Sequence, residues 1–152
     1  MTNYDMLCKQ LAALSEGNPH RIAKLANASA LLFSEVDRLN WAGFYFLEGD
    51  QLILGPFQGK PACIALRLGR GVCGTAAAED RTLLVEDVHA FAGHIACDSA
   101  SRSEIVVPLH EGGRVTGVLD IDSPELARFT EDDRVGIEAF AKTLEQFLAA
   151  DV

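Results

Sequence analysis

Apolar residues occupy the odd positions of two neighbouring segments, residues 103–109 and 114–122, and this alternation limits the fold more than any other feature of the sequence. A period of two is typical of a β-strand that buries one face. The four residues between the segments include Gly112 and Gly113, which suit a tight turn. The pattern therefore predicts an antiparallel hairpin.

The same alternation predicts the register of this hairpin. Residues that face each other across two strands point to the same side of the sheet, so odd positions must pair with odd positions. A three-residue loop of Glu111, Gly112 and Gly113 satisfies this condition, whereas a two-residue Gly-Gly loop would place each apolar face opposite a polar one. The three-residue loop predicts that Glu104 lies across from Asp120.

Asp122 then lies on the same sheet face as Glu104 and Asp120, two residues farther along. Three carboxylates on one face repel one another, and partial burial would raise their pKa values. Two interpretations stay open on this pattern. The face is either exposed to water, as acidic residues usually are, or it forms a site for a cationic group, a metal or a general acid.

The rest of the chain completes an α+β pattern. Residues 39–47 and 52–57 predict a second hairpin, and residues 62–68 and 82–85 predict two further strands. Helices are expected at 4–14, across the stripe from Ile22 to Phe33, at 72–79, and after Thr130, which suits an N-cap. We therefore expect a single domain over 1–152 with about six antiparallel strands and flanking helices.

The bulk composition excludes several classes of protein. The 152 residues carry a net charge of -9 and a pI near 4.8, which disfavours binding to nucleic acid or to an anionic membrane surface. The sequence has neither an apolar run long enough to span a membrane nor a signal peptide, so we expect a cytoplasmic protein. No Gly-rich phosphate loop or dinucleotide fingerprint is present, and no cofactor is expected.

Cys63, Cys73 and Cys97 lie within one stretch, and in a reducing cytoplasm such thiols indicate metal binding or catalysis. No Cys-x2-4-Cys pair is present, which argues against a zinc site. A Cys97–His94 or Cys97–His89 nucleophile lacks an evident third member. A redox relay fits better, because Cys97 lies in the long irregular segment 88–102.

The other two thiols of this stretch are expected on regular elements. Cys63 falls in the predicted strand 62–68. Cys73 falls near a helix N-terminus, where the helix dipole favours a thiolate. Cys8, far away in the first helix, is interpreted as a packing residue.

Trp41, Gly43 and Tyr45 share one face of the strand 39–47, and Phe44 lies on the other. Aromatic residues on one strand face usually belong to a core. A pocket wall is the second interpretation.

Several stretches together resemble the free methionine-R-sulfoxide reductases, which are single GAF domains. The resemblance covers roughly residues 20–148. It rests on Asn40-Trp41-Ala42-Gly43-Phe44-Tyr45, Gly55-Pro56-Phe57-Gln58-Gly59, Gly71-Val72-Cys73-Gly74-Thr75-Ala76, Val85-Glu86-Asp87-Val88-His89, Gly93-His94-Ile95-Ala96-Cys97-Asp98 and Gly117-Val118-Leu119-Asp120-Ile121-Asp122-Ser123.

The resemblance implies a GAF domain with a six-stranded antiparallel sheet flanked by helices, often a homodimer, that reduces free methionine-R-sulfoxide with thioredoxin as reductant. It implies that Cys97 is the catalytic cysteine and that Cys63 and Cys73 are recycling cysteines. Trp41 and Tyr45 would line the pocket for the methyl end. Glu104, Asp120 and Asp122 would bind or polarise the substrate.

The chemistry expected from this resemblance begins with attack of the Cys97 thiolate on the sulfoxide sulfur, while a carboxylic acid protonates the oxygen. Cys97 is left as sulfenic acid, and Cys63 or Cys73 condenses with it to a disulfide that thioredoxin reduces. The rival hypothesis is a sensory GAF module that binds a small ligand without catalysis, because this fold hosts many roles.

Overall fold

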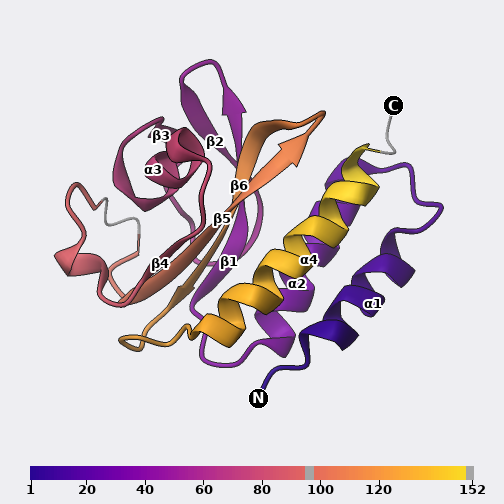
Figure 1. Cartoon of the computed structure of the whole chain (residues 1–152), viewed down its shortest axis with the longest axis horizontal. Helices are drawn as coiled ribbons and strands as arrows, with labels where there is room; N and C mark the ends of the chain where they lie inside the picture. The colour runs from indigo at the N-terminus through magenta and orange to yellow at the C-terminus, as the bar shows by residue number, and fades with distance from the viewer. Residues whose placement is uncertain (95–97, 150–152) are drawn as a thin grey trace.

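The computed structural model describes residues 1–94 and 98–149, and their fold follows the predicted α+β pattern (Figure 1). In chain order the described elements are α1 (Tyr4–Ser15), α2 (Arg21–Glu35), β1 (Trp41–Glu48), β2 (Gln51–Gly59), β3 (Ala65–Arg67), α3 (Gly71–Glu79), β4 (Leu83–Val85), the 3-10 helix η1 (Val88–Ala90), β5 (Ser103–Glu111), β6 (Arg114–Ser123) and α4 (Glu131–Ala149).

The strands form one six-stranded sheet in the order β3-β2-β1-β6-β5-β4, and all neighbours are antiparallel. Helices α1, α2 and α4 lie on one face of the sheet, and α3 lies on the other (Figure 1). The predicted α+β fold with a six-stranded antiparallel sheet is thus confirmed. Among the described residues, no helix is both long enough and apolar enough to cross a membrane.

The two faces of the sheet belong to two hydrophobic cores, because side chains of a strand alternate between its faces. In β1, Ala42 and Phe44 pack under the helical layer. Trp41 and Tyr45 pack on the opposite side, with α3. The predicted division of aromatic residues between the two faces of this strand is confirmed.

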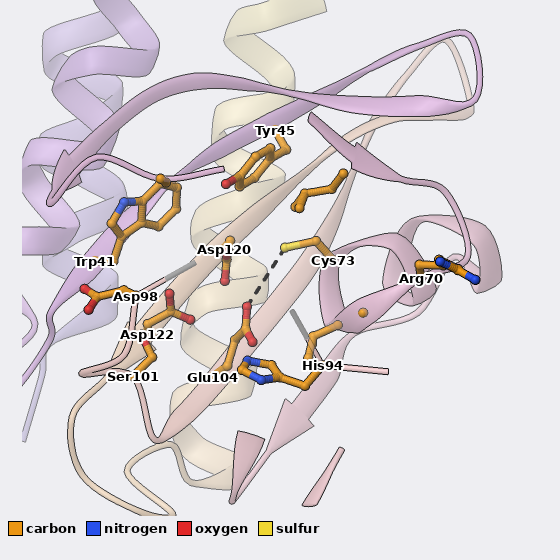
Figure 2. Close-up of a pocket in the computed structure, with 14 residues that line it drawn as sticks. Trp41, Tyr45, Arg70, Cys73, His94, Asp98, Ser101, Glu104, Asp120 and Asp122 are labelled. Atoms are coloured by element: carbon orange, nitrogen blue, oxygen red, sulfur yellow. Dashed lines mark hydrogen bonds between the residues drawn. The ribbon is translucent and has the colours of Figure 1, made fainter. Parts of the chain in front are cut away.

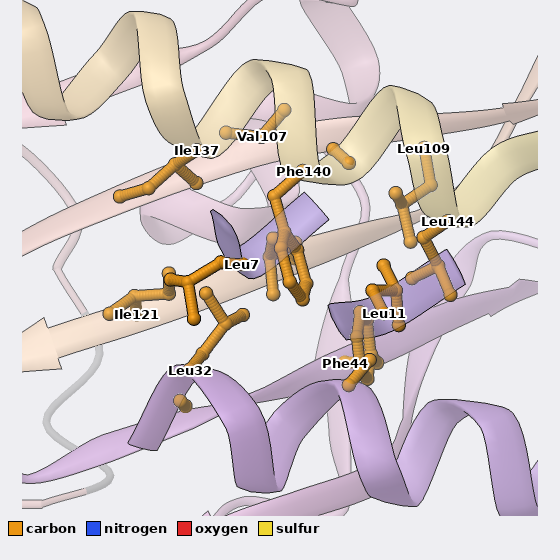
Figure 3. Close-up of a cluster of buried hydrophobic side chains, with 14 of the residues drawn as sticks. Leu7, Leu11, Leu32, Phe44, Val107, Leu109, Ile121, Ile137, Phe140 and Leu144 are labelled. Carbon is orange, nitrogen blue, oxygen red and sulfur yellow. The ribbon is translucent and has the colours of Figure 1, made fainter. Parts of the chain in front are cut away.

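The helical layer is held by large apolar side chains from three helices and the sheet. Leu7 and Leu11 of α1 and Leu32 of α2 meet Phe44 of the sheet and Phe140 of α4 (Figure 3). Thr130 caps α4 as predicted: the Asp133 amide donates to Thr130 Oγ1 at 3.2 Å, and the Thr130 amide donates to Asp133 Oδ2 at 2.8 Å. This reciprocal cap fixes where the last helix begins.

The β5–β6 hairpin has a register that differs from the prediction. Glu104 lies across from Asp122, and Asp120 lies across from Val106. The turn is the two-residue Gly112–Gly113 loop, since Glu111 pairs with Arg114, and both glycines have positive φ angles of 63° and 78°. A register shift between Leu109 and His110 brings odd positions opposite odd positions again.

Cys63 does not lie on a strand, contrary to the prediction for residues 62–68. The β2–β3 ladder ends at the pair Ile53–Ala65, and one further bond joins the Leu54 amide to the Ile64 carbonyl at 2.9 Å. Continuing the same register would bring Ala62 opposite Pro56, which has no N–H to donate. Cys63 therefore lies in the connection that leads into β3.

Candidate active site

A pocket opens on the α3 face of the sheet and gathers most of the predicted site residues (Figure 2). It is lined by Trp41, Tyr45, Ala62, Leu66, Arg70, Gly71, Val72, Cys73, His94, Asp98, Ser101, Glu104, Asp120 and Asp122. Cys97 lies outside the described residues. Cys63 borders this region through its backbone, since its carbonyl accepts a hydrogen bond from the Tyr45 hydroxyl at 3.0 Å.

The acidic side of the pocket is built by three neighbouring strands. Trp41 of β1 pairs with Asp122 of β6, and Gly43 pairs with Asp120. Glu104 of β5 pairs with Asp122 on the other edge of β6. Because paired residues point to the same side of a sheet, the three carboxyl groups converge beneath Trp41 and Tyr45 (Figure 2).

Glu104 and Asp120 are almost completely buried, with exposed fractions of 7% and 6%. The interpretation as a water-exposed sheet face is therefore wrong. Burial raises the pKa of Glu104 well above its ordinary value, and repulsion by Asp120 and Asp122 raises it further. Burial likewise raises the pKa values of Asp122 and Asp120. Glu104 therefore favours its protonated form, which is the form a general acid requires.

Two buried carboxylate oxygens in this pocket have no hydrogen-bond partner among the described residues. They are Asp120 Oδ1 and Asp122 Oδ1. A buried acceptor without a donor costs roughly 1–3 kcal/mol, so these atoms are suited to a ligand that supplies donors or positive charge. An ammonium group would satisfy them.

Cys73 lies beside the acids and donates to Glu104 Oε2 at a distance of 3.9 Å (Figure 2). It occupies the first turn of α3 as predicted, but the expected thiolate is not favoured there. Burial raises the pKa of the Cys73 thiol well above its ordinary value, and the nearby Asp120 and Glu104 raise it further. These effects outweigh the helix dipole, because the loss of water and the nearby carboxyl groups both disfavour the thiolate.

The other side of the pocket is an aromatic wall. The ring centroids of Trp41 and Tyr45 lie 5.9 Å apart, and Phe57 stacks on Trp41 at 5.2 Å. The polar tips of both wall residues are already engaged, since Trp41 Nε1 donates to the Lys60 carbonyl at 3.1 Å and the Tyr45 hydroxyl donates to the chain at Cys63. Their apolar ring faces are what remains for a ligand. Both interpretations of this strand face hold: the residues are buried in a core and also line the pocket.

Sequence reasoning missed the polar mouth of the pocket. Asn40 Nδ2 donates to Asp98 Oδ2 at 3.0 Å and to Ser101 Oγ at 2.9 Å, and the Asn40 amide donates to the Asp122 carbonyl at 3.0 Å. Asn40 thus joins the start of β1, the end of β6 and the segment that follows Cys97. The one available signal was the position of Asp98 and Ser101 in a long irregular segment.

His94 lines the same pocket near Glu104 (Figure 2). Burial lowers its pKa, and the neighbouring His89 lowers it further. The two imidazole rings meet edge to face with centroids 6.1 Å apart. His94 is therefore a neutral hydrogen-bonding group at physiological pH rather than a cation.

The comparisons with known proteins point to one group. The GAF domain family matches residues 24–149. A free methionine-R-sulfoxide reductase of Escherichia coli is 52% identical over 146 residues, which cover 96% of this chain and 88% of that protein. A second one, from Saccharomyces cerevisiae, is 41% identical over 150 residues and covers 93% and 83%. The structure of the fRMsr of Staphylococcus aureus in complex with substrate has a TM-score of 0.93 and 54% identity, covering 98% and 97%.

Proposed function

Because the chain belongs to the GAF-domain family of free methionine-R-sulfoxide reductases, we propose that it reduces free L-methionine-R-sulfoxide to L-methionine in the cytoplasm. One observation carries this proposal from the residues themselves. A cluster of three carboxyl groups, of which Glu104 and Asp120 are almost completely buried, lies beneath an aromatic wall and beside a thiol. Two of the three groups have a buried oxygen without a donor among the described residues. Such a site offers charge to an ammonium group, an apolar surface to a methyl group and a proton to an oxygen.

The free amino acid is held by both sides of the pocket in this proposal. Its ammonium group pairs with the Asp120 and Asp122 oxygens that have no donor within residues 1–94 and 98–149. Its S-methyl group packs against Trp41 and Tyr45, whose ring faces are apolar. A methionine sulfoxide inside a protein has no free ammonium group, which explains selectivity for the free amino acid.

Glu104 is proposed as the general acid. Its pKa is raised by burial and by both aspartates, so it holds the proton that the sulfoxide oxygen needs. The Cys97 thiolate attacks the substrate sulfur, and the oxygen passes to Cys97. Methionine then leaves, and Cys97 becomes a sulfenic acid.

Cys63 is proposed to condense with this sulfenic acid first, forming a disulfide and releasing water. Cys73 is less suited to the first condensation, because its thiol is buried and its raised pKa disfavours the nucleophilic thiolate. Thioredoxin then reduces the disulfide by thiol–disulfide exchange, which returns two thiols. The proposal retains a homodimer, which the resemblance implies and which analytical ultracentrifugation tests.

The decisive experiment separates this enzyme from a sensory GAF module. Reduced protein is mixed with free methionine-R-sulfoxide without reductant, and free thiols and methionine are counted. We expect two thiols lost and one methionine formed per chain, and neither change in Cys97→Ser at unchanged far-UV circular dichroism. A chain that binds the sulfoxide but keeps all its thiols is a sensory module.

A further inference from the structure

Three potential ligand atoms, a sulfur and two carboxyl oxygens, meet in the pocket. The Cys73 sulfur, one Glu104 oxygen and one Asp120 oxygen all lie within 4.8 Å of one another, and all three residues are buried. They come from α3, β5 and β6, so the fold rather than sequence proximity brings them together. For this reason, the absence of a Cys-x2-4-Cys pair does not exclude a metal site here.

We propose that this Cys73–Glu104–Asp120 triad binds a single thiophilic divalent cation such as Zn²⁺, and that the bound ion blocks the pocket. A thiolate with carboxylates suits Zn²⁺, Co²⁺ or Cd²⁺ and disfavours Mg²⁺ and Ca²⁺, which prefer oxygen ligands alone. Asp120 Oδ1 supplies the second observation, since it is a buried acceptor without a donor among the described residues. Asp120 itself is only 6% exposed.

The Cys73–Glu104 pair needs only a small contraction to hold the ion. Zinc ligands lie about 2.0–2.3 Å from the metal, so sulfur and oxygen ligands of one tetrahedral ion lie roughly 3.5 Å apart. The Cys73 sulfur and Glu104 Oε2 are 3.9 Å apart without an ion. Three protein ligands leave one tetrahedral position for water.

The charge balance also favours the ion. Three acidic groups crowd a buried volume, and burial raises the pKa of each, which favours bound protons over negative charge. A dication replaces those protons: Cys73 releases its proton and becomes the sulfur ligand, and each carboxyl group releases any proton that it holds. Affinity for the metal must therefore rise with pH.

This inference deepens the proposed function, because the ion would take the carboxyl groups that the substrate needs. Zn²⁺ should then act as a competitive inhibitor, raising KM for the sulfoxide at unchanged kcat. A reversible block of this kind would rest on Cys73 in its reduced form and would end when a chelator removes the ion.

Cobalt titration of the whole reduced protein tests the site without any use of catalysis. Co²⁺ bound to a thiolate gives a near-ultraviolet charge-transfer band, and we expect one equivalent per chain, displaced by Zn²⁺. Cys73→Ser should lose the band, whereas the matched variants Cys8→Ser and Cys63→Ser should keep it. Glu104→Gln and Asp120→Asn should keep the band but bind at least about tenfold more weakly, roughly what even outer partners of a metal contribute.

Specific results would contradict the proposed metal site. A band that persists in Cys73→Ser, or that vanishes in Cys63→Ser, places the metal on other thiols. Affinities unchanged in both carboxyl variants exclude the triad even if Cys73→Ser fails to fold. Cobalt binding in a chain that does not reduce methionine sulfoxide would overturn the proposed function alone, and full activity at saturating Zn²⁺ would overturn the block alone.

Discussion

Glu104 shows how position alone changes the chemistry of an ordinary carboxyl group. Its strand neighbours place it opposite Asp122, and the pocket leaves only 7% of it exposed. Two carboxyl groups and the loss of water then act in the same direction on its pKa. An acid for sulfoxide chemistry thus needs no cofactor, only burial and like charge.

We expect Glu104→Gln to lower kcat by roughly 10²–10⁴-fold, the range that a positioned general acid contributes. The amide keeps the shape but has no acidic proton. The matched control is Glu86→Gln, an exposed carboxyl group after β4, which should keep the wild-type rate. Steady-state kinetics with free methionine-R-sulfoxide measures both, and an unchanged kcat in Glu104→Gln would remove this residue as the acid.

Individual residues divide sharply into those that the sequence predicted and those that it did not. Trp41, Tyr45, Cys73, Glu104, Asp120 and Asp122 were predicted and line one pocket. Asn40 was missed, because it bridges Asp98 and Asp122, which lie far from it in the sequence, and no local pattern records such contacts. The burial of Cys73 was missed for the same reason: a helix terminus can be read from sequence, but what packs over it cannot.

At the scale of elements, alternation predicted the strands and their faces well, and the ladder details poorly. The odd-with-odd rule for β5 and β6 is correct, yet the hairpin obeys it by a shift between Leu109 and His110 rather than by a longer turn. Both solutions satisfy the apolar pattern. The choice between them depends on backbone geometry at Gly112 and Gly113, whose positive φ angles close the shorter loop.

The connection between β1 and the segment after Cys97 is the element-level contact most open to test. Asn40→Ala removes two side-chain hydrogen bonds, to Asp98 and to Ser101. Leaving a buried partner unsatisfied costs about 1–3 kcal/mol. We expect faster hydrogen exchange at the Ala100 and Ser101 amides and a lower kcat/KM, because this segment follows the proposed nucleophile.

Asn27→Ala on the exposed side of α2 is the matched control for this change and should alter neither exchange nor activity. Ser101→Ala removes one of the two bonds and should give an intermediate effect. If exchange at 98–101 is the same in Asn40→Ala as in the wild type, Asn40 does not hold the segment.

At the scale of the whole molecule, the sheet separates a structural layer from the pocket layer. Gly136 of α4 lies directly under the Tyr4 ring of α1, and an added Cβ would come within 2.1 Å of a ring carbon. Tyr4 is also tied to Asp133 by a hydrogen bond of 2.7 Å from its hydroxyl. The ring therefore cannot move aside without losing its hydrogen bond to Asp133.

Gly136→Ala should lower the free energy of unfolding by about 1–3 kcal/mol, as overpacking does, and leave kcat and KM unchanged. For a chain of this size each kcal/mol shifts Tm by about 2–4 °C. Differential scanning calorimetry measures the change in stability, and steady-state kinetics measures kcat and KM. Tyr4→Ala should largely cancel the effect in the double variant, and additivity of the two changes would contradict the clash.

The acidic pocket also predicts how stability varies with pH. Burial raises the folded pKa values of Glu104 and Asp122 above the ordinary 4.5 and 3.8, so the folded chain binds more protons than the unfolded chain. Stability from these groups is full below those ordinary values and falls as pH rises through the folded pKa values. Asp133, whose pKa is lowered, acts only in the acid range below 3.8.

Urea unfolding between pH 5 and pH 8 should therefore give a stability that declines as pH rises. The double variant Glu104→Gln/Asp122→Asn should flatten this decline. His110 contributes with the same sign: burial acts to lower its pKa, but hydrogen bonds with Asp80 and Glu145 outweigh burial and raise it. A decline that is equally steep in the double variant would assign it to His110 rather than to the pocket.

Strand β1 supplies neighbouring residues to two different tasks, Trp41 and Tyr45 to the pocket and Ala42 and Phe44 to the helical core. A single-residue insertion or deletion in it would exchange the two sets, sending an indole into the helical layer and a methyl group into the pocket. Variation in this pocket must therefore arise by substitution at every second position. A change in the length of this strand therefore affects the pocket and the helical core together.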